Sequence, residues 1–162
     1  MRIYGRDVPT PDGIWQLYSQ IIQSPDLWAA GEFKGAAVNV GFRKIAPRQG
    51  YLSFSGKNYM TGQAIIVDDF IEEIRLFIGS EPKDLTEMLY KEDRAKIPQL
   101  ASEYSALFRQ KLGEPRIAHD NDIFEYNDHR VRVLSSACVW VVISNLSVIR
   151  QLPNDWWPHP ST

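Results

Sequence analysis

The chain has 162 residues, of which 44% are hydrophobic and 23% are charged, a composition that is typical of a folded globular domain and excludes disorder throughout. Its 18 basic and 20 acidic residues give a formal net charge of −2. The chain therefore lacks the basic excess with which nucleic-acid-binding proteins contact phosphate, and we expect no nucleic-acid partner. The single cysteine, Cys138, excludes an intramolecular disulfide and a zinc site of four thiolates.

The beginning of the chain predicts an extended lead-in followed by helix. Pro9 and Pro11 disfavour regular structure in residues 1–12, which contain no apolar core of the signal-peptide type. No stretch approaches the roughly 20 apolar residues that a membrane span needs, so we expect a cytoplasmic protein without a membrane contact. From Gly13 the apolar residues recur at helical spacing, and Ser24-Pro25-Asp26 then indicates the start of a second, short helix.

The middle of the chain predicts strands. Residues 68–78 fit one face of a helix as well as an alternating strand. We favour a strand from about Glu72 to Ile78, because Gly79-Ser80-Glu81-Pro82 forms a natural loop after it. Three earlier runs alternate partly between apolar and polar residues, as strands do: Ala36 to Phe42, Tyr51 to Ser55, and Gln63 to Val67.

The next segment predicts two helices, Pro82 to Arg94 and Pro98 to Leu112. Pro98 ends the first helix and is tolerated in the first turn of the second. Gly113 is placed to end the second helix in a left-handed conformation, and Pro115 prevents its continuation. The apolar stripe of this second helix comprises Leu100, Tyr104, Leu107, Phe108 and Leu112.

A β-hairpin is predicted for residues 122–134. Asn127-Asp128 is compatible with a two-residue hairpin loop. In the register that this loop sets, an apolar pair lies on one face and a pair of opposite charges lies on the other, which supports the hairpin. These pairs are Phe124 with Val131 and Glu125 with Arg130.

Cys138 to Ile143 is apolar at nearly every position, as expected of a central strand covered on both faces, and Leu146 to Gln151 predicts an edge strand. Residues 153–162 form a tail rich in proline and tryptophan. The elements together predict a single α+β domain over residues 1–162. We expect its antiparallel sheet to be covered on one face by the N-terminal helix and the central helical segment.

The order of helix, strands, a helix that ends in Lys-Leu-Gly-Glu-Pro (Lys111 to Pro115) and a hairpin resembles that of many small bacterial proteins of unassigned function. Some of these are immunity proteins of contact-dependent toxin systems. The resemblance covers mainly the region after Gly79 and transfers no functional residue. It implies that the partner is another protein, such as a toxin domain.

Two features suggest a surface for a partner. Four carboxylates lie within six residues before and inside the predicted strand; such a run is commonly a solvated edge, but it can also dock a basic partner or hold a divalent ion. Two adjacent tryptophans near the end of the chain cannot both point inward, so one can close the core while the other anchors a partner. The candidate partner-binding residues are therefore Asp68, Asp69, Glu72, Glu73, Trp156 and Trp157.

The sequence contains no glycine-rich phosphate loop, no dinucleotide fingerprint and no hydrolase elbow, so we expect no cofactor. His119, Asp120 and Asp122 form the most suggestive polar cluster, because an imidazole and carboxylates together can act as acid and base. One local histidine is too few for zinc, and we expect no metal. A polar loop before the hairpin is the simpler interpretation of this cluster.

The leading hypothesis is a non-catalytic protein that binds and occludes another protein, as an immunity protein neutralises a toxin. One alternative is a small enzyme whose acid–base group is His119, Asp120 and Asp122. A second alternative is a small-ligand-binding protein with a pocket between helix and sheet. Surplus aromatic residues, 12% of the chain, and slight acidity favour the binding protein. The sequence leaves the partner's identity and the oligomeric state open.

Overall fold

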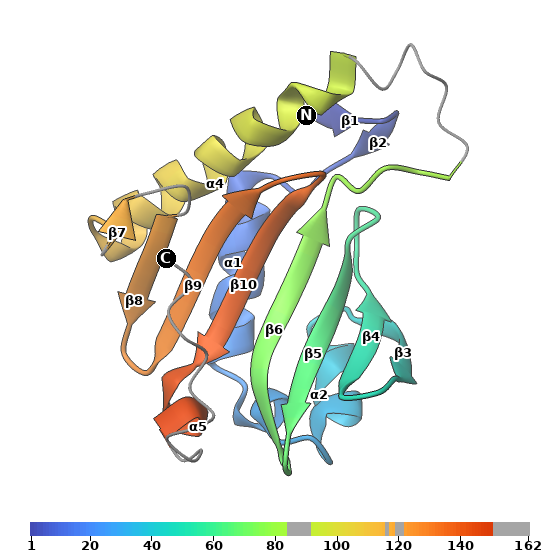
Figure 1. The fold of residues 1–162 in the computed structure, drawn as a ribbon, viewed down its shortest axis with the longest axis vertical. Helices are drawn as coiled ribbons and strands as arrows, with labels where there is room; N and C mark the ends of the chain where they lie inside the picture. The colour runs from blue at the N-terminus through green and yellow to red at the C-terminus, as the bar shows by residue number, and fades with distance from the viewer. Residues whose placement is uncertain (84–91, 116, 119–121, 151–162) are drawn as a thin grey trace.

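The computed structural model describes residues 1–83, 92–115, 117, 118 and 122–150. It confirms the α+β class, with one large antiparallel sheet whose inner face is covered by helices (Figure 1). Within the described ranges, no helix is both long enough and apolar enough to cross a membrane.

The strands of the large sheet are β3 (Arg43–Pro47), β4 (Tyr51–Ser55), β5 (Thr61–Val67), β6 (Phe70–Ile78), β7 (Ile117–Ala118), β8 (Asp122–Tyr126), β9 (His129–Ser135) and β10 (Val139–Asn145). Their order is β3-β4-β5-β6-β10-β9-β8-β7, and all neighbours are antiparallel. The sheet thus consists of two meanders, β3 to β6 and β7 to β10, which the pair β6–β10 joins (Figure 1).

Helices α1 (Pro11–Ile22) and α4 (Lys96–Leu112) pack on the inner face of the sheet, as the sequence predicted. Helix α1 starts two residues before the predicted Gly13, because the Thr10 side chain accepts a hydrogen bond of 3.0 Å from the Gly13 amide. The rings of Tyr18 and Phe108 meet edge to face at 5.2 Å between the two helices. Gly113 ends α4 at the predicted position with a positive φ of 91°, which glycine adopts readily, but its ψ of −173° is extended and differs from that of the predicted left-handed stop.

The predicted strand from Ala36 to Phe42 is wrong, because most of these residues belong to helix α2 (Phe33–Asn39). Phe33 and Ala37 are completely buried, whereas Val38 is 66% exposed. This is the spacing of one helix face. The short helix predicted to start at Ser24-Pro25-Asp26 is the 3-10 helix η1 (Pro25–Trp28).

The predicted edge strand from Leu146 to Gln151 is also wrong over its described residues, which form helix α5 (Leu146–Arg150). The side chain of Asn145 accepts hydrogen bonds from the amides of Ser147 and Val148 at 3.0 and 3.3 Å. An asparagine that satisfies the first free amides of a helix favours helix over strand at that point.

The hairpin of β8 and β9 has the predicted register, with Phe124 opposite Val131 and Glu125 opposite Arg130. Its loop residue Asn127 has a φ of 54°, which asparagine tolerates better than most residues. The choice of strand for residues 72–78 is confirmed by β6, and β10 occupies the predicted central position.

The predicted helix from Pro82 to Arg94 falls mostly outside the described residues, although residues 92–94 are helical. The predicted extended lead-in contains a small hairpin of β1 (Arg2–Ile3) and β2 (Arg6–Asp7), so the first residues are more ordered than their prolines suggested. Tyr4 and Gly5 form its turn with positive φ angles of 54° and 73°.

Candidate partner-binding groove

The predicted acidic run does not form one surface. Asp68 and Asp69 are exposed in the turn between β5 and β6, whereas Glu72 and Glu73 are 5% and 8% exposed within β6. An extra residue in β6 interrupts its pairing with β5 at this point, since Ile65 pairs with Glu73 and Ile66 with Ile71. The bulge therefore separates two exposed carboxylates from two buried ones.

The two buried carboxylates differ in their partners. Glu73 forms an ion pair of 2.6 Å with Arg75 and lies 3.8 Å from a guanidinium nitrogen of Arg132 on β9. Glu72 has no hydrogen bond or ion pair to a described residue. Burial, with a contribution from the neighbouring Glu73, raises the pKa of Glu72 from 4.5 to about 7, and Arg75 opposes the shift.

The other predicted site residues are only partly placed. His119, Asp120, Trp156 and Trp157 lie outside the described residues. Asp122 begins β8 and lies 3.8 Å from Arg109 of α4. Among the described residues, no three His, Cys, Asp or Glu side chains are grouped so that they could hold a metal ion. Cys138 is buried, and burial raises the pKa of its thiol.

A surface depression lies beside β3 and the β4–β5 loop. Three adjoining hollows of about 650, 360 and 270 Å³ all include Lys57 in their walls, and neighbouring hollows share further residues. We call the combined depression the basic groove. It runs from the start of α1, at Pro9 and Thr10, past Lys57 to Arg43 at the start of β3.

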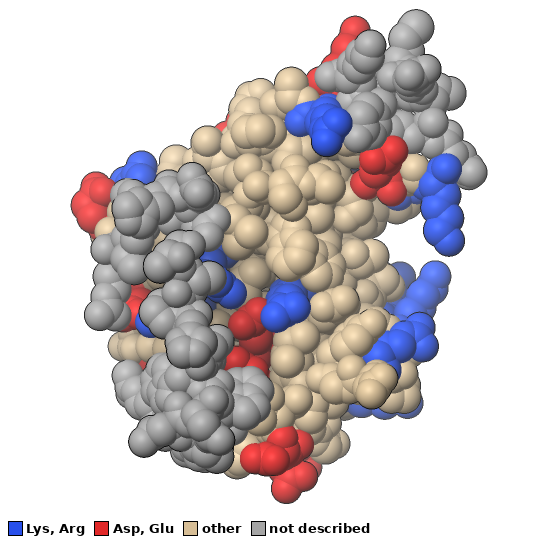
Figure 2. All heavy atoms as spheres, in the orientation of Figure 1, with Lys and Arg blue, Asp and Glu red and all other residues tan. Residues whose placement is uncertain are grey.

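Four cations line the basic groove: Arg6, Arg43, Lys44 and Lys57. None of them forms an ion pair with a described carboxylate. Elsewhere on the described surface Arg2, Arg75, Lys96, Arg109, Arg130 and Arg132 are paired, whereas Lys34, Arg48, Lys83 and Lys111 also form no ion pair with a described carboxylate. The groove differs from these scattered residues in that its four cations line one depression. Figure 2 shows Lys and Arg side chains along the edge of the molecule that carries β3 and β4, with no Asp or Glu beside them in this view.

The exposed acidic turn does not neutralise this charge. The groove residues Gly56 to Thr61 precede and begin β5, while Asp68 follows the end of the same strand. Seven residues of strand separate the two ends by roughly 20 Å, about twice the distance over which salt screens exposed charges. The Asp68 turn therefore leaves the charge of the groove in place, and the nearer exposed carboxylate, Asp7 beside Arg6 in β2, pairs with Arg2 at 3.5 Å and not with a groove cation.

The backbone of the groove contains three residues other than glycine with positive φ angles. The β4–β5 loop contains a tight turn from Lys57 to Met60, whose central residues Asn58 and Tyr59 have φ angles of 57° and 58°. Lys44 opposite has a φ of 52°. Left-handed conformations cost a residue with a Cβ on the order of 1 kcal/mol, and such strain gathers at functional sites more often than elsewhere.

The loop holds its side chains in defined places. Arg6 from β2 lies over the ring of Tyr59 at 4.4 Å from the ring centre, although Tyr59 is 64% exposed. Gly41 has a φ of 86°, and a Cβ there would lie 3.5 Å from Cε of Lys57. The Lys57 stem thus rests against a backbone position without a side chain, and Lys57 lines all three hollows of the groove.

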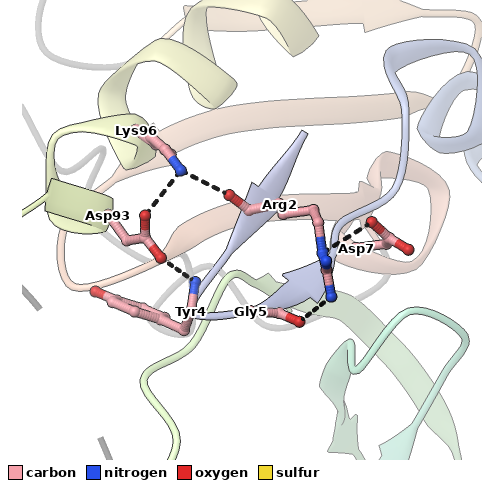
Figure 3. Close-up of polar contacts among 6 residues, drawn as sticks. All are labelled: Arg2, Tyr4, Gly5, Asp7, Asp93 and Lys96. Atoms are coloured by element: carbon pink, nitrogen blue, oxygen red, sulfur yellow. Dashed lines mark hydrogen bonds and ion pairs between the residues drawn. The ribbon is translucent and has the colours of Figure 1, made fainter. Parts of the chain in front are cut away.

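A cluster of polar contacts around the buried Asp93, which we call the clasp, fixes the hairpin that carries Arg6 (Figure 3). The Asp93 carboxylate accepts a hydrogen bond of 2.5 Å from the Tyr4 amide and pairs with Lys96 at 2.8 Å. Lys96 in turn donates to the Arg2 carbonyl at 3.1 Å. Hydrogen bonding to Lys96 is the main cause that holds the pKa of Asp93 below its ordinary value. The clasp ties the groove wall to the start of α4.

Sequence reasoning missed this groove because its cations come from separate segments. Residues 6, 43, 44 and 57 are brought together by the N-terminal hairpin, the edge strand β3 and the β4–β5 loop. A net charge of −2 concealed the local excess. The turn at Lys57 was the one available signal, since a lysine followed by asparagine in a turn exposes its charge.

Comparison with protein-family models, with curated proteins and with solved structures finds no match to this chain.

Proposed function

We propose that the protein is a non-catalytic binding protein that acts by covering a surface of another protein, as an inhibitor or an immunity protein covers a toxin. The observation that carries this proposal is the basic groove, whose four cations have no described carboxylate partner. Unpaired charge that is held in a defined concave geometry is complementary to a partner of opposite sign, and such complementarity speeds association and selects the partner.

The groove also has the mixed chemistry of a protein interface. Its walls include the exposed side chains of Val38 and Tyr59 and the partly buried Val40, next to the amide groups of Gln20 and Asn58. Tyrosine and arginine are enriched at protein interfaces, where an aromatic ring supplies contact area and a guanidinium binds carboxylates. This combination supports a macromolecular partner over a small ligand, which would leave most of the groove open.

Cross-linking of the protein with its partner in extracts of its own cells tests the proposal. We expect one partner protein at a fixed stoichiometry, with cross-links from Lys44 and Lys57. Changing both residues to glutamine removes the amines that the cross-linker needs, so the double variant is compared with the wild type by pull-down without cross-linking, where we expect loss of this partner. Lys34→Gln is the matched control, because Lys34 is exposed on α2 and does not line the groove. Cross-links that avoid the groove, or equal recovery with the double variant, would refute the proposed role.

A further inference from the structure

We infer that the basic groove takes a polypeptide segment rich in aspartate and glutamate, an inference that rests on the proposed function and names the chemistry of the partner. Four cations within one depression need several negative charges to neutralise them, and these charges must be spaced along the groove from Arg6 to Arg43. Carboxylates at intervals along an acidic segment provide such spacing.

The charge of the remaining surface disfavours a long polyanion. The chain has 18 basic and 20 acidic residues, so 14 basic and 20 acidic residues remain when the four groove cations are set aside. A nucleic acid extends beyond the groove and meets this negative surface, and neutralising only four phosphates gives weak binding at physiological salt. An acidic segment ends where the groove ends and avoids that repulsion.

The groove aromatic is already engaged. Proteins that bind single-stranded nucleic acids stack bases on exposed aromatic rings. Here the Arg6 guanidinium lies over one face of the Tyr59 ring at 4.4 Å. The ring thus serves to hold a guanidinium, and a planar guanidinium held in place is suited to grip a carboxylate through two parallel hydrogen bonds.

The groove is too extended for a single phosphate or a small dianion. Its largest hollow alone is about 650 Å³, and it adjoins the hollow beside α1, with which it shares Lys57 and Asn58. Along this length the exposed Val38 and the partly buried Val40 offer apolar contacts beside the cations. The matching segment therefore alternates acidic and apolar side chains instead of presenting one cluster of charge.

Fluorescence anisotropy with a labelled 12-residue peptide of alternating glutamate and valine tests this inference directly. We expect binding that weakens as salt rises, and at least tenfold weaker binding of the same peptide with glutamine in place of glutamate. The double variant Arg43→Gln/Lys57→Gln should weaken binding of the acidic peptide about fivefold to twentyfold, since an exposed ion pair contributes up to about fivefold. Lys34→Gln and Arg48→Gln, which remove cations outside the groove, should change it less than twofold.

Tyr59→Gly separates binding from folding. Glycine accepts the left-handed conformation at this position, so the variant should unfold at higher denaturant concentration than the wild type while it releases Arg6 and binds the peptide more weakly. Equal binding of the glutamate and glutamine peptides would overturn the inference. Tighter binding of a 12-nucleotide oligouridine than of the peptide would also overturn it. So would displacement of the peptide by inorganic phosphate at concentrations below about 1 mM, because such an affinity would indicate a specific phosphate site.

The two proposals can fail separately. If the peptide binds as expected but cross-linking finds no partner at the groove, the acidic-segment site stands and the covering function falls. If cross-links define a partner at the groove but the peptide and its glutamine version bind alike, the covering function stands and the acidic-segment inference falls.

Discussion

Replacing Glu72 with glutamine should stabilise the protein, and the gain should grow as the pH rises from 4.5 to about 7. Glu72 is 5% exposed at the bulge of β6. Burial raises the pKa of its carboxyl from 4.5 to about 7. At about 1.4 kcal/mol per pKa unit, this difference corresponds to a cost of about 3 kcal/mol for keeping the charged form in the folded protein.

The direction of the pH dependence follows from proton binding. Between pH 4.5 and about 7 the folded protein holds a proton on Glu72 that the unfolded chain has lost. The stability contribution of the neutral carboxyl is therefore full below pH 4.5 and is lost as the pH rises through about 7. Glutamine stays neutral, so the variant should match the wild type near pH 4.5 and exceed it by about 2 to 3 kcal/mol at pH 8.

Urea denaturation at a series of pH values measures this difference. At pH 8 the expected gain corresponds to a rise of roughly 6 to 10 °C in the melting temperature. Glu73→Gln is the matched control, because Glu73 pairs with Arg75 and Arg132 and its loss should destabilise by about 1 to 3 kcal/mol. A Glu72→Gln variant whose stability follows that of the wild type at every pH would refute the assignment of a buried, neutral carboxyl.

Three further substitutions test the packing of the core, each read as a change in the free energy of unfolding. Gly62→Ala should cost about 2 to 3 kcal/mol, because a Cβ there would lie 2.3 Å from the Phe54 ring and 2.7 Å from a backbone carbonyl oxygen. Tyr104→Phe should cost about 1 to 2 kcal/mol, because the buried hydroxyl donates a hydrogen bond of 2.7 Å to the Pro9 carbonyl. Tyr18→Phe should be neutral or slightly stabilising, because its buried hydroxyl has no hydrogen-bond partner among the described residues.

Each of these substitutions has an internal comparison. The two tyrosine variants remove the same atom from equally buried sites, so equal effects would contradict the assigned hydrogen bonding. Gly35→Ala adds the same methyl group in α2, where no atom lies within 4 Å, and should not destabilise. A cost of Gly62→Ala no larger than that of Gly35→Ala would show that β4 and β5 can separate to admit the added group.

The fold was predictable where local chemistry and tertiary packing agree. The β8–β9 hairpin followed from its loop and its paired side chains, and the end of α4 followed from Gly113. The two wrong strands were short apolar stretches, for which periodicity does not distinguish strand from helix. In α2 the buried residues Phe33, Ala36 and Ala37 recur at helical spacing, and in α5 the Asn145 side chain satisfies the first amides of the helix; alternation alone reveals neither feature.

The candidate site was less predictable because a surface depends on which segments meet. The acidic run was visible as a block, but the bulge in β6 divides it between solvent and interior. The basic groove gathers residues from three distant segments, and only the strand order brings them together. The predicted roles of Trp156, Trp157, His119 and Asp120 stay predictions, because these residues lie outside the described part of the chain.

The division of the sheet into two meanders has a consequence for how quickly the chain reaches its native state. Within each meander the neighbouring strands are joined by short turns, so their loops close at low entropic cost. The seam between β6 and β10 instead pairs Ile78 with Val139 across some 60 residues of chain. We expect the pairing of β6 with β10 to be the late step that limits the folding rate. Substitutions in β10 should therefore slow folding more than substitutions in β4 that lower the free energy of unfolding by the same amount.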